Sequence, residues 1–359
     1  MEVARKVNAA INVDGGGTLV IEDLAIGDPG PTPVLIKRCA TGGCHSPLPQ
    51  IHHPAVSRPL GLGHESTGGV AKGRAVTPVA AGDRVLVTWV QRDRVAHTPE
   101  PTRWPATFRG PPVRPGDRSP TGVCTWAERP RADQPDVVTL PEAAAPTEVT
   151  AMVGCAVMTG GGAVLHAAQV RPGQSVAVLG AGGVGVCVRP AAYNMGADPI
   201  LVVDRTDAKM AVAQTCGASV GITASRADAV ARSRALTGGG AEVVFEAIGL
   251  GQTTEPMLAA TRPGGNGLQD GGMAVLVGGP PGAPPTIPPR DLFVGTIVRG
   301  APGGTCRPAR DRPLFGRWGR EGRLPPDRRV TRRYTLDQIN AACDARAPGE
   351  SAGRAIVAC

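Results

Sequence analysis

The stretch that decides the fold is Gln174-Ser175-Val176-Ala177-Val178-Leu179 followed by Gly180-Ala181-Gly182-Gly183-Val184-Gly185. The apolar first half predicts a buried strand, and the second half is a turn with the spacing Gly-x-Gly-x-x-Gly that opens a helix. Gly180 permits a tight turn, Gly182 lets a pyrophosphate approach the backbone, and Gly185 lets helix and strand pack closely. The first N–H groups of the helix would face the phosphates. This context predicts a dinucleotide-binding loop; the alternative is a glycine turn without a cofactor.

Further strands follow this loop along the chain. Apolar runs at Ile200–Asp204, Val243–Phe245 and Met273–Val277 alternate with helical stretches such as 207–216. Continuous apolar strands alternating with helices are typical of a parallel sheet that is covered on both faces. Pro190 falls about two turns into the helix after the loop, so we expect that helix to bend or to be less stable there.

Asp204 ends the second strand, where a carboxylate can accept hydrogen bonds from both adenosine-ribose hydroxyls and repel a 2′-phosphate. The position favours NAD over NADP. Arg205 next to it supports the alternative, because an arginine can hold that phosphate.

Three residues far apart in the chain can form one metal site. Cys44 lies in Ala-Thr-Gly-Gly-Cys-His-Ser (40–46), His64 in Gly-His-Glu (63–65), and Cys155 in Gly-Cys-Ala-Val-Met-Thr-Gly (154–160). Two thiolates and one imidazole leave the fourth position of a tetrahedral zinc open, which is the pattern of a catalytic site. The alternative is that both cysteines are small buried apolar residues. Metal ligands that are followed along the chain by a dinucleotide-binding loop indicate an enzyme that oxidises alcohols by hydride transfer.

The remaining cysteines have no comparable context, and we assign them no role; they are Cys39, Cys124, Cys187, Cys216, Cys306, Cys343 and Cys359. Nine dispersed cysteines, a start unlike a signal peptide, and no apolar run of about 18 residues predict a cytoplasmic protein that does not enter a membrane. A length of 359 residues predicts two domains.

The net charge is +8, and ten arginines lie between Arg307 and Arg333. That run has no nucleic-acid-binding motif, so it is interpreted as a solvated face, with a nucleic-acid surface as the alternative.

The rest of the chain divides into segments that differ in composition and in hydrophobic pattern. Residues 1–100 are β-rich, with strands predicted at Val34–Lys37 and Arg84–Val90, whereas 91–122 is a polar lobe rich in arginine and proline. Val149–Val153 leads into a helix. Near the C-terminus the pattern predicts an amphipathic helix at Leu336–Ala345 and a last strand at Arg354–Val357.

In these residues the chain resembles the zinc-containing medium-chain alcohol dehydrogenases, in particular the bacterial NAD-linked branch near the thiol-dependent formaldehyde dehydrogenases. The matching stretches are Val34–Ser46, Gly63–Glu65, Ala81–Val85, Gly154–Gly160, Gly180–Gly185, Asp204, Phe245–Gly249, Arg262–Gly265 and Val330–Val357. The resemblance implies an α/β fold with two domains. A GroES-like, partly closed β-barrel would comprise 1–155 and 302–359, and a doubly wound parallel-sheet (Rossmann) NAD-binding domain 156–301. It also implies a homodimer or homotetramer acting on a small alcohol or aldehyde.

The resemblance assigns roles by position. Cys44, His64 and Cys155 match the ligands of the catalytic zinc, Glu65 the carboxylate near that zinc, and Ser46 the hydroxyl that takes the alcohol proton. The residues that match cofactor contacts are His45, Thr159, Gly180, Gly182, Gly183, Val184, Gly185, Asp204, Lys209 and Arg354.

Four departures from the family pattern stand out. Residues 88–122 contain no cysteine, so the family's structural zinc is expected to be absent, which leaves one zinc per chain. Pro47 stands where the family's aspartate orients the zinc-binding histidine, and losing such a partner typically costs about 10- to 100-fold in metal affinity or activity. Pro49 stands where some members carry a proton-relay histidine; His52 and His53 are candidate substitutes or ordinary surface residues. Residues 266–272 look like an insertion.

The sequence therefore predicts a zinc-dependent enzyme that transfers a hydride between a primary or secondary alcohol and NAD. Two rivals remain: a zinc-free reductase on the same scaffold, and a non-redox protein that uses the scaffold to bind a ligand. Pro47 supports the first rival, whereas the intact set Cys44, His64, Cys155 and Ser46 argues against the second.

Overall fold

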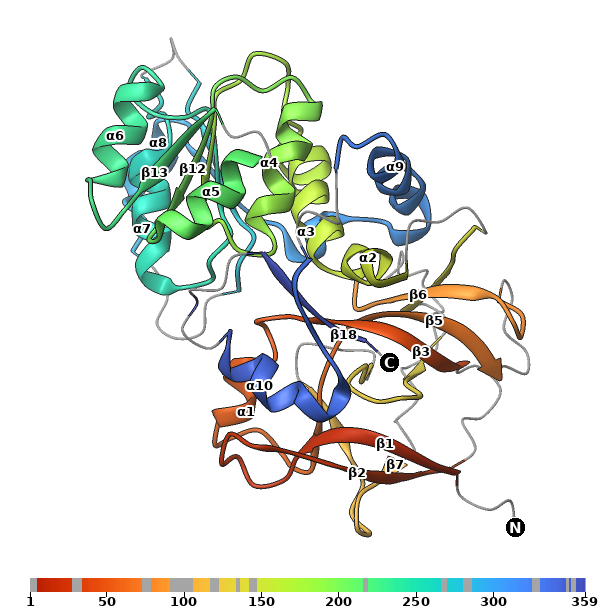
Figure 1. Cartoon of the computed structure of the whole chain (residues 1–359). Coiled ribbons are helices and arrows are strands. Elements are labelled where there is room, and N and C mark those ends of the chain that lie inside the picture. Colours follow the sequence, from red (N-terminus) through yellow and green to blue (C-terminus); the bar gives the residue numbers. More distant parts are fainter. Residues whose placement is uncertain are drawn as a thin grey trace.

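The computed structural model describes residues 5–27, 34–72, 79–90, 106–116, 123–133, 136–141, 147–215, 219–265, 270–279, 286–324, 330–346, 349 and 353–358. It contains one parallel sheet and two largely antiparallel sheets (Figure 1). The cysteine-free lobe predicted at 91–122 lies mostly outside the described residues, as does most of the expected insertion at 266–272.

The parallel sheet has six strands in the order β13-β12-β11-β14-β15-β16. Their bounds are Val220–Thr223, Ile200–Asp204, Val176–Leu179, Val243–Glu246, Met273–Leu276 and Ile297–Gly300. Every neighbouring pair is parallel, and the chain reverses its direction across the sheet between β11 and β14. This is the strand order of a doubly wound dinucleotide-binding sheet, as the alternating apolar strands predicted.

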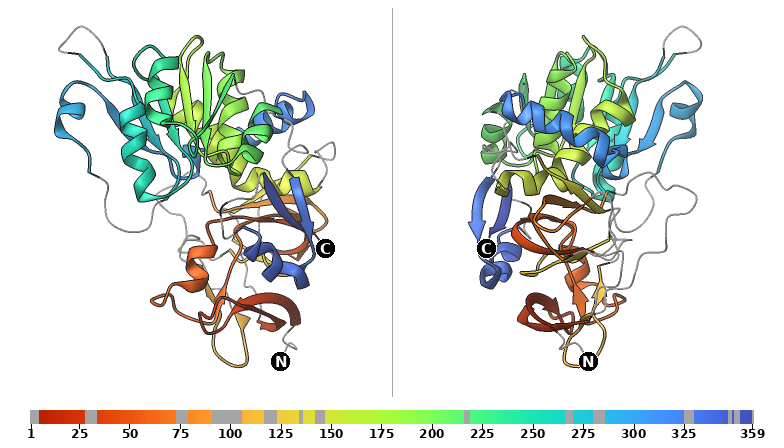
Figure 2. Two further views of the ribbon diagram at one scale, coloured as in Figure 1. Left: turned by 60° about the vertical axis from the view of Figure 1, so that its left-hand side comes forward. Right: turned by 90° about the vertical axis from the view of Figure 1, so that its right-hand side faces the viewer.

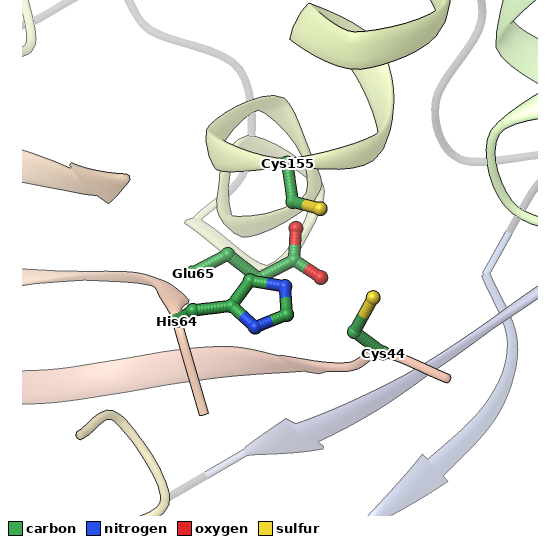
Figure 3. Close-up of side chains that lie close together, drawn as sticks. All are labelled: Cys44, His64, Glu65 and Cys155. Carbon is green, nitrogen blue, oxygen red and sulfur yellow. The ribbon is translucent and has the colours of Figure 1, made fainter. Parts of the chain in front are cut away.

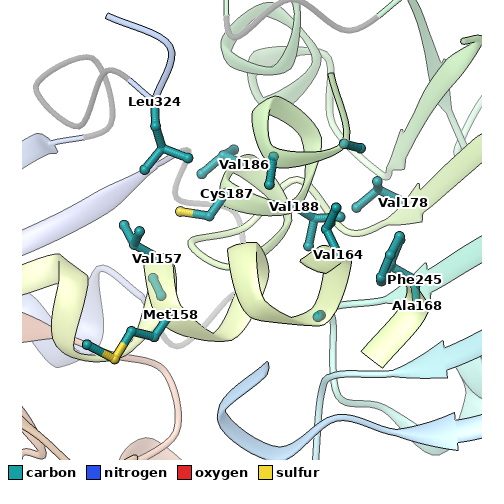
Figure 4. Close-up of a cluster of buried hydrophobic side chains, with 14 of the residues drawn as sticks. Val157, Met158, Val164, Ala168, Val178, Val186, Cys187, Val188, Phe245 and Leu324 are labelled. Atoms are coloured by element: carbon teal, nitrogen blue, oxygen red, sulfur yellow. The ribbon is translucent and has the colours of Figure 1, made fainter. Parts of the chain in front are cut away.

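Helices cover both faces of this sheet (Figure 2). They are α3 (Ala156–Gly162), the π-helix η3 (Ala163–Ala168), α4 (Gly185–Asn194), α5 (Asp207–Thr215), α6 (Ala229–Leu236) and α7 (Gly251–Ala260). The short helix α8 (Pro289–Phe293) precedes β16 and has no buried residue. Figure 4 shows part of the largest apolar cluster, where Val157 of α3 faces Cys187 of α4. Helix α4 does not end at Pro190 but continues for four more residues. One missing N–H removes a single backbone bond, and burial of the proline compensates in part.

The two other sheets form the second half of the molecule. One runs β7-β2-β1-β4-β8, with bounds Ala106–Thr107, Leu19–Ile26, Arg5–Asn12, Leu60–Gly61 and Arg114–Pro115. The other runs β10-β6-β5-β3-β18-β17, with bounds Val137–Thr139, Arg84–Thr88, Glu65–Lys72, Val34–Gly43, Arg354–Ala358 and Val330–Tyr334, and β9 (Arg131–Ala132) pairs with β3. The predicted strands at 34–37, 84–90 and 354–357 are confirmed, although β6 ends two residues earlier than expected.

The remaining helices are short, except for α9. They are α1 (Leu48–His52), α2 (Thr147–Ala151), the 3₁₀ turns η2 (Met152–Gly154) and η4 (Pro302–Thr305), α9 (Pro308–Arg320), the 3₁₀ turn η6 (Leu336–Gln338) and α10 (Ile339–Asp344). The predicted amphipathic helix at 336–345 is thus a capped 3₁₀ turn that continues into α10.

Among the described residues no single helix is long and apolar enough to cross a membrane. The bent pair Thr147–Gly154 and Ala156–Ala168 passes that test by length and composition. Most of its side chains are buried in the core.

Candidate metal centre and dinucleotide site

Four side chains that could bind a metal converge beneath α3 (Figure 3). Cys44 follows β3, His64 and Glu65 lie at the start of β5, and Cys155 lies between η2 and α3. One ligand atom from each residue lies within 4.8 Å of those of the others, and all four residues are buried. The structure therefore brings together the three predicted zinc ligands and the neighbouring carboxylate.

The donor set suits zinc. In tetrahedral geometry, zinc–sulfur bonds of about 2.3 Å place two sulfur atoms roughly 3.8 Å apart, which is compatible with this cluster. His64 Nε2 is buried and has no hydrogen-bond partner. A buried ring nitrogen is costly when it is unpaired, so its position among two thiols and a carboxylate indicates a site built for a cation.

The two thiols are electrostatically unequal. A hydrogen bond with Cys155, supported by the charges of His64 and Arg354, holds the pKa of Cys44 well below its ordinary value although burial opposes this. The same hydrogen bond, together with burial, raises the pKa of Cys155 well above its ordinary value. A bound zinc ion would displace the thiol protons, because a coordinating thiol is deprotonated.

Arg354 connects the glycine loop to Cys44, His64, Glu65 and Cys155, the four potential metal ligands that we call the metal cluster. Its guanidinium pairs with Glu65, and both side chains are fully buried. A Cβ on Gly183 would collide with the Arg354 side chain, and one on Gly42 would collide with the Glu65 carboxylate. Both glycines therefore leave the room that this buried ion pair needs.

The glycine loop has the predicted geometry. Gly180 has φ +103°, which favours glycine, and a Cβ on Gly185 would collide with the Gly180 carbonyl. A Cβ on Gly182 would meet nothing within 4 Å, so the backbone there is open to a ligand. Asp204 reaches back to the loop, because its Oδ2 accepts the Ala181 N–H at 2.8 Å.

The other predicted cofactor contacts surround these two features. Lys209 Nζ lies 3.2 Å from Asp204 Oδ1. Thr159 is buried on α3 and Val184 is half-buried at the start of α4, whereas His45 is exposed beside Cys44. Arg205, the alternative phosphate ligand, is exposed.

Of the candidate proton carriers, Ser46 is the one beside the metal cluster, with its Oγ 3.5 Å from Cys44 Sγ. His52 and His53 are exposed. The His52 ring faces Gly17, and His53 Nδ1 accepts the N–H of Ala55, so neither side chain is directed at the cluster.

Sequence reasoning missed two side chains at this site. The Trp89 ring lies edge-on to His64 with centroids 6.2 Å apart, and Gln50 is buried close to Pro47. The available signals were the position of Trp89 directly after the strand Arg84–Thr88 and that of Gln50, a polar residue on a short helix beside Cys44.

A second group of side chains that could bind a metal consists of His166, Cys306 and Asp311, whose ligand atoms also lie within 4.8 Å of one another. Its carboxylate is already satisfied: Asp311 accepts Arg310 Nε at 2.8 Å and the Arg307 N–H at 2.8 Å, and its Oδ2 lies 2.9 Å from His166 Nε2. The Arg310 guanidinium also contacts the His166 ring. Burial raises the pKa of the Cys306 thiol, which disfavours the thiolate that a metal needs. We interpret this group as an ion-paired cap of α9.

Comparison with known proteins agrees with this geometry. Residues 30–142 match the alcohol dehydrogenase GroES-like domain and residues 183–307 the zinc-binding dehydrogenase domain. The chain is 32% identical to geraniol dehydrogenase of Castellaniella defragrans, over 96% of this chain and 95% of that protein. It is 28% identical to S-(hydroxymethyl)glutathione dehydrogenase of Paracoccus denitrificans, over 96% and 98% of the two chains.

Among solved structures, benzyl alcohol dehydrogenase from Acinetobacter calcoaceticus superposes with a TM-score of 0.86 at 26% identity, over 99% of both chains. The chain belongs to the zinc-dependent medium-chain alcohol dehydrogenase family, as the sequence resemblance predicted, and it is an oxidoreductase.

Proposed function

We propose that the protein uses one zinc ion per chain, held by Cys44, His64 and Cys155, to transfer a hydride between a primary or secondary alcohol and NAD. The observation that carries the proposal is the buried convergence of these side chains, with Nε2 of His64 unpaired, next to a glycine loop that Arg354 connects to the same cluster. When bound, zinc would make the alcohol hydroxyl more acidic and NAD would accept the hydride.

The protein's own residues would transfer the proton, balance charge at the site and bind the cofactor. Ser46 is the group that would carry the alcohol proton away from the cluster. Glu65 is the nearby carboxylate that balances the charge of Arg354. The cofactor would lie along Gly180–Gly185, with its phosphates near Arg354 and His45, its ribose at Asp204 and Lys209, and its nicotinamide near Thr159 and Val184.

The proposal extends to the whole molecule. Residues 1–155 and 302–359 would form the catalytic domain and 156–301 the NAD-binding domain, with the substrate between them. The relatives named for geraniol and benzyl alcohol, and the Trp89 ring beside His64, favour an alcohol on an apolar or aromatic group. A cytoplasmic location and a dimer or tetramer complete the proposal.

The test is metal analysis combined with turnover of benzyl alcohol. The parent should contain one tightly bound zinc per chain, and Cys155→Ala should lose both the zinc and the activity, because two ligands leave the coordination sphere open. The matched control is Cys306→Ala, which removes a buried thiol of the second group and should keep the zinc.

Two zinc ions per chain, one of them lost in Cys306→Ala, would show that the second group binds metal. Full activity without any metal would favour the zinc-free rival, and cofactor binding without turnover of any alcohol would favour the ligand-binding rival.

A further inference from the structure

A small hollow lies beside His64. Its lining consists of Pro47, Gln50, Leu62, Gly63, His64, Gly116 and Val123. Of the four residues in the metal cluster, only His64 contributes to it. The hollow is partly open to solvent, and the centre of a water molecule can occupy about 10 Å³ of it, which is about the space that one water needs.

The two ring nitrogens of His64 face different surroundings. Nε2 is the buried nitrogen without a partner, and in Figure 3 one ring nitrogen faces the Glu65 and Cys155 groups while the other points away from them. A histidine that binds a metal through one nitrogen normally donates the N–H of the other to an oxygen, which fixes the tautomer and the orientation of the ring. The Pro47 side chain carries no such oxygen, and no described residue hydrogen-bonds to Nδ1.

Gln50 brings an oxygen to this hollow. It lies three residues after Pro47 on α1, and residues three apart in a helix share a face. Its Nε2 donates to the Ser46 carbonyl at 3.3 Å, which orients the amide. Its Oε1 lies 2.7 Å from the position that a Cβ on Gly116 would occupy, so this oxygen is at the wall of the hollow. The side chain is buried, with 7% exposure.

We propose that Gln50 is the positioning residue for His64: its Oε1 accepts, through one water molecule in the hollow, the hydrogen bond that His64 Nδ1 donates. The inference rests on the proposed zinc site. A water bridge is nearly as favourable in enthalpy as a direct hydrogen bond. The water bridge takes the place of the hydrogen bond that an aspartate at position 47 would accept from His64. Gln50 supplies the acceptor from about one helical turn further along α1. Because the acceptor is neutral, the histidine is a less basic ligand than one paired with a carboxylate.

The experiment measures how fast the zinc-loaded full chain loses zinc to a chromophoric chelator. Gln50→Leu keeps the size of the side chain but removes the oxygen, and should release zinc about tenfold faster, the lower end of the effect of losing such a partner. Gln50→Glu keeps an acceptor oxygen but loses the donation to the Ser46 carbonyl, so it should retain zinc better than Gln50→Leu. Gln252→Leu makes the same change at an exposed position of α7 and should match the parent.

A second background separates positioning from a merely structural role. Pro47→Asp supplies a direct acceptor and should slow zinc release by up to about tenfold. In that background Gln50→Leu should cost less than twofold, because the two residues serve the same N–H and their effects are then not additive. Thermal melting of each metal-free variant checks that it is folded.

The outcomes separate the two proposals. A parent that binds no zinc would overturn the proposed function and this inference with it. A parent that binds zinc, with Gln50→Leu releasing it at the parental rate, would overturn this inference alone. So would equal losses from Gln50→Leu in both backgrounds, or a folded Pro47→Asp variant that releases zinc faster than the parent.

Discussion

At the residue scale, the proposed preference for NAD over NADP depends on Asp204. This side chain is buried, is held by Ala181 N–H and Lys209, and has the exposed Arg205 beside it. Asp204→Ala should weaken the preference for NAD over NADP by about 10- to 100-fold, the worth of one or two hydrogen bonds to a charged group. The measurement is kcat/KM for both cofactors with one alcohol. Asp207→Ala, an exposed neighbour, is the control, and a parent that prefers NADP would transfer the role to Arg205.

The residue scale also shows where sequence reasoning ends. Cys44, His64 and Cys155 were found because each lies in a local stretch with a recognisable pattern, and Pro47 was noticed for the same reason. Gln50 and Trp89 have no such pattern. Their importance comes from the side chains across the hollow and the cluster, and those contacts exist only after β3, β5 and β6 have paired.

At the element scale, strands with continuous apolar runs were predicted well, whereas the two-residue strands were not, because two residues carry no periodicity. Helix α9 was also missed: the sequence showed its arginines as a solvated face, and two prolines obscured the helical pattern. The available signals were Pro308 at the first turn and the buried pair Phe315 and Trp318, three residues apart.

The start of α9 gives a pH prediction. Burial alone would raise the pKa of Asp311, but hydrogen bonds from Arg310 and from the Arg307 N–H hold it below the ordinary carboxyl value. A depressed native pKa adds stability above the unfolded pKa that is lost as the pH falls through the native pKa. Asp311→Asn should therefore lower the unfolding free energy by about 1–3 kcal/mol at pH 7. This gap should persist to about pH 5 and shrink below about pH 4.

Urea unfolding of both proteins across this pH range measures the gap. The exposed Asp337→Asn variant controls for loss of a surface carboxylate. A gap that is unchanged at acidic pH would mean that the Asp311 side chain acts through its shape and not through its charge.

At the scale of the whole molecule, the chain leaves the antiparallel sheets after β10, builds the parallel sheet, and returns at its end. The last strand, β18, is inserted between β3 and β17, with Ala355 opposite Gly43 and Val357 opposite Thr41. Sequence periodicity predicted this strand but could not place it, because pairing across some 300 residues leaves no local signal. The same strand supplies Arg354 to the metal cluster and the glycine loop.

Deletion of residues 353–359 should therefore abolish folding of the antiparallel half. Ile356 and Val357 are fully buried, and burying such side chains contributes about 1.5–3 kcal/mol each. Glu65 would also be left as a buried unpaired charge, at a cost of about 3–5 kcal/mol. These losses are comparable to a typical total stability of about 5–15 kcal/mol. The truncated chain should be recovered as aggregate, whereas a chain lacking only Cys359 keeps all of β18 and should melt like the parent. A truncated protein that is soluble and unfolds cooperatively near the parental temperature would mean that the antiparallel sheets hold together without β18.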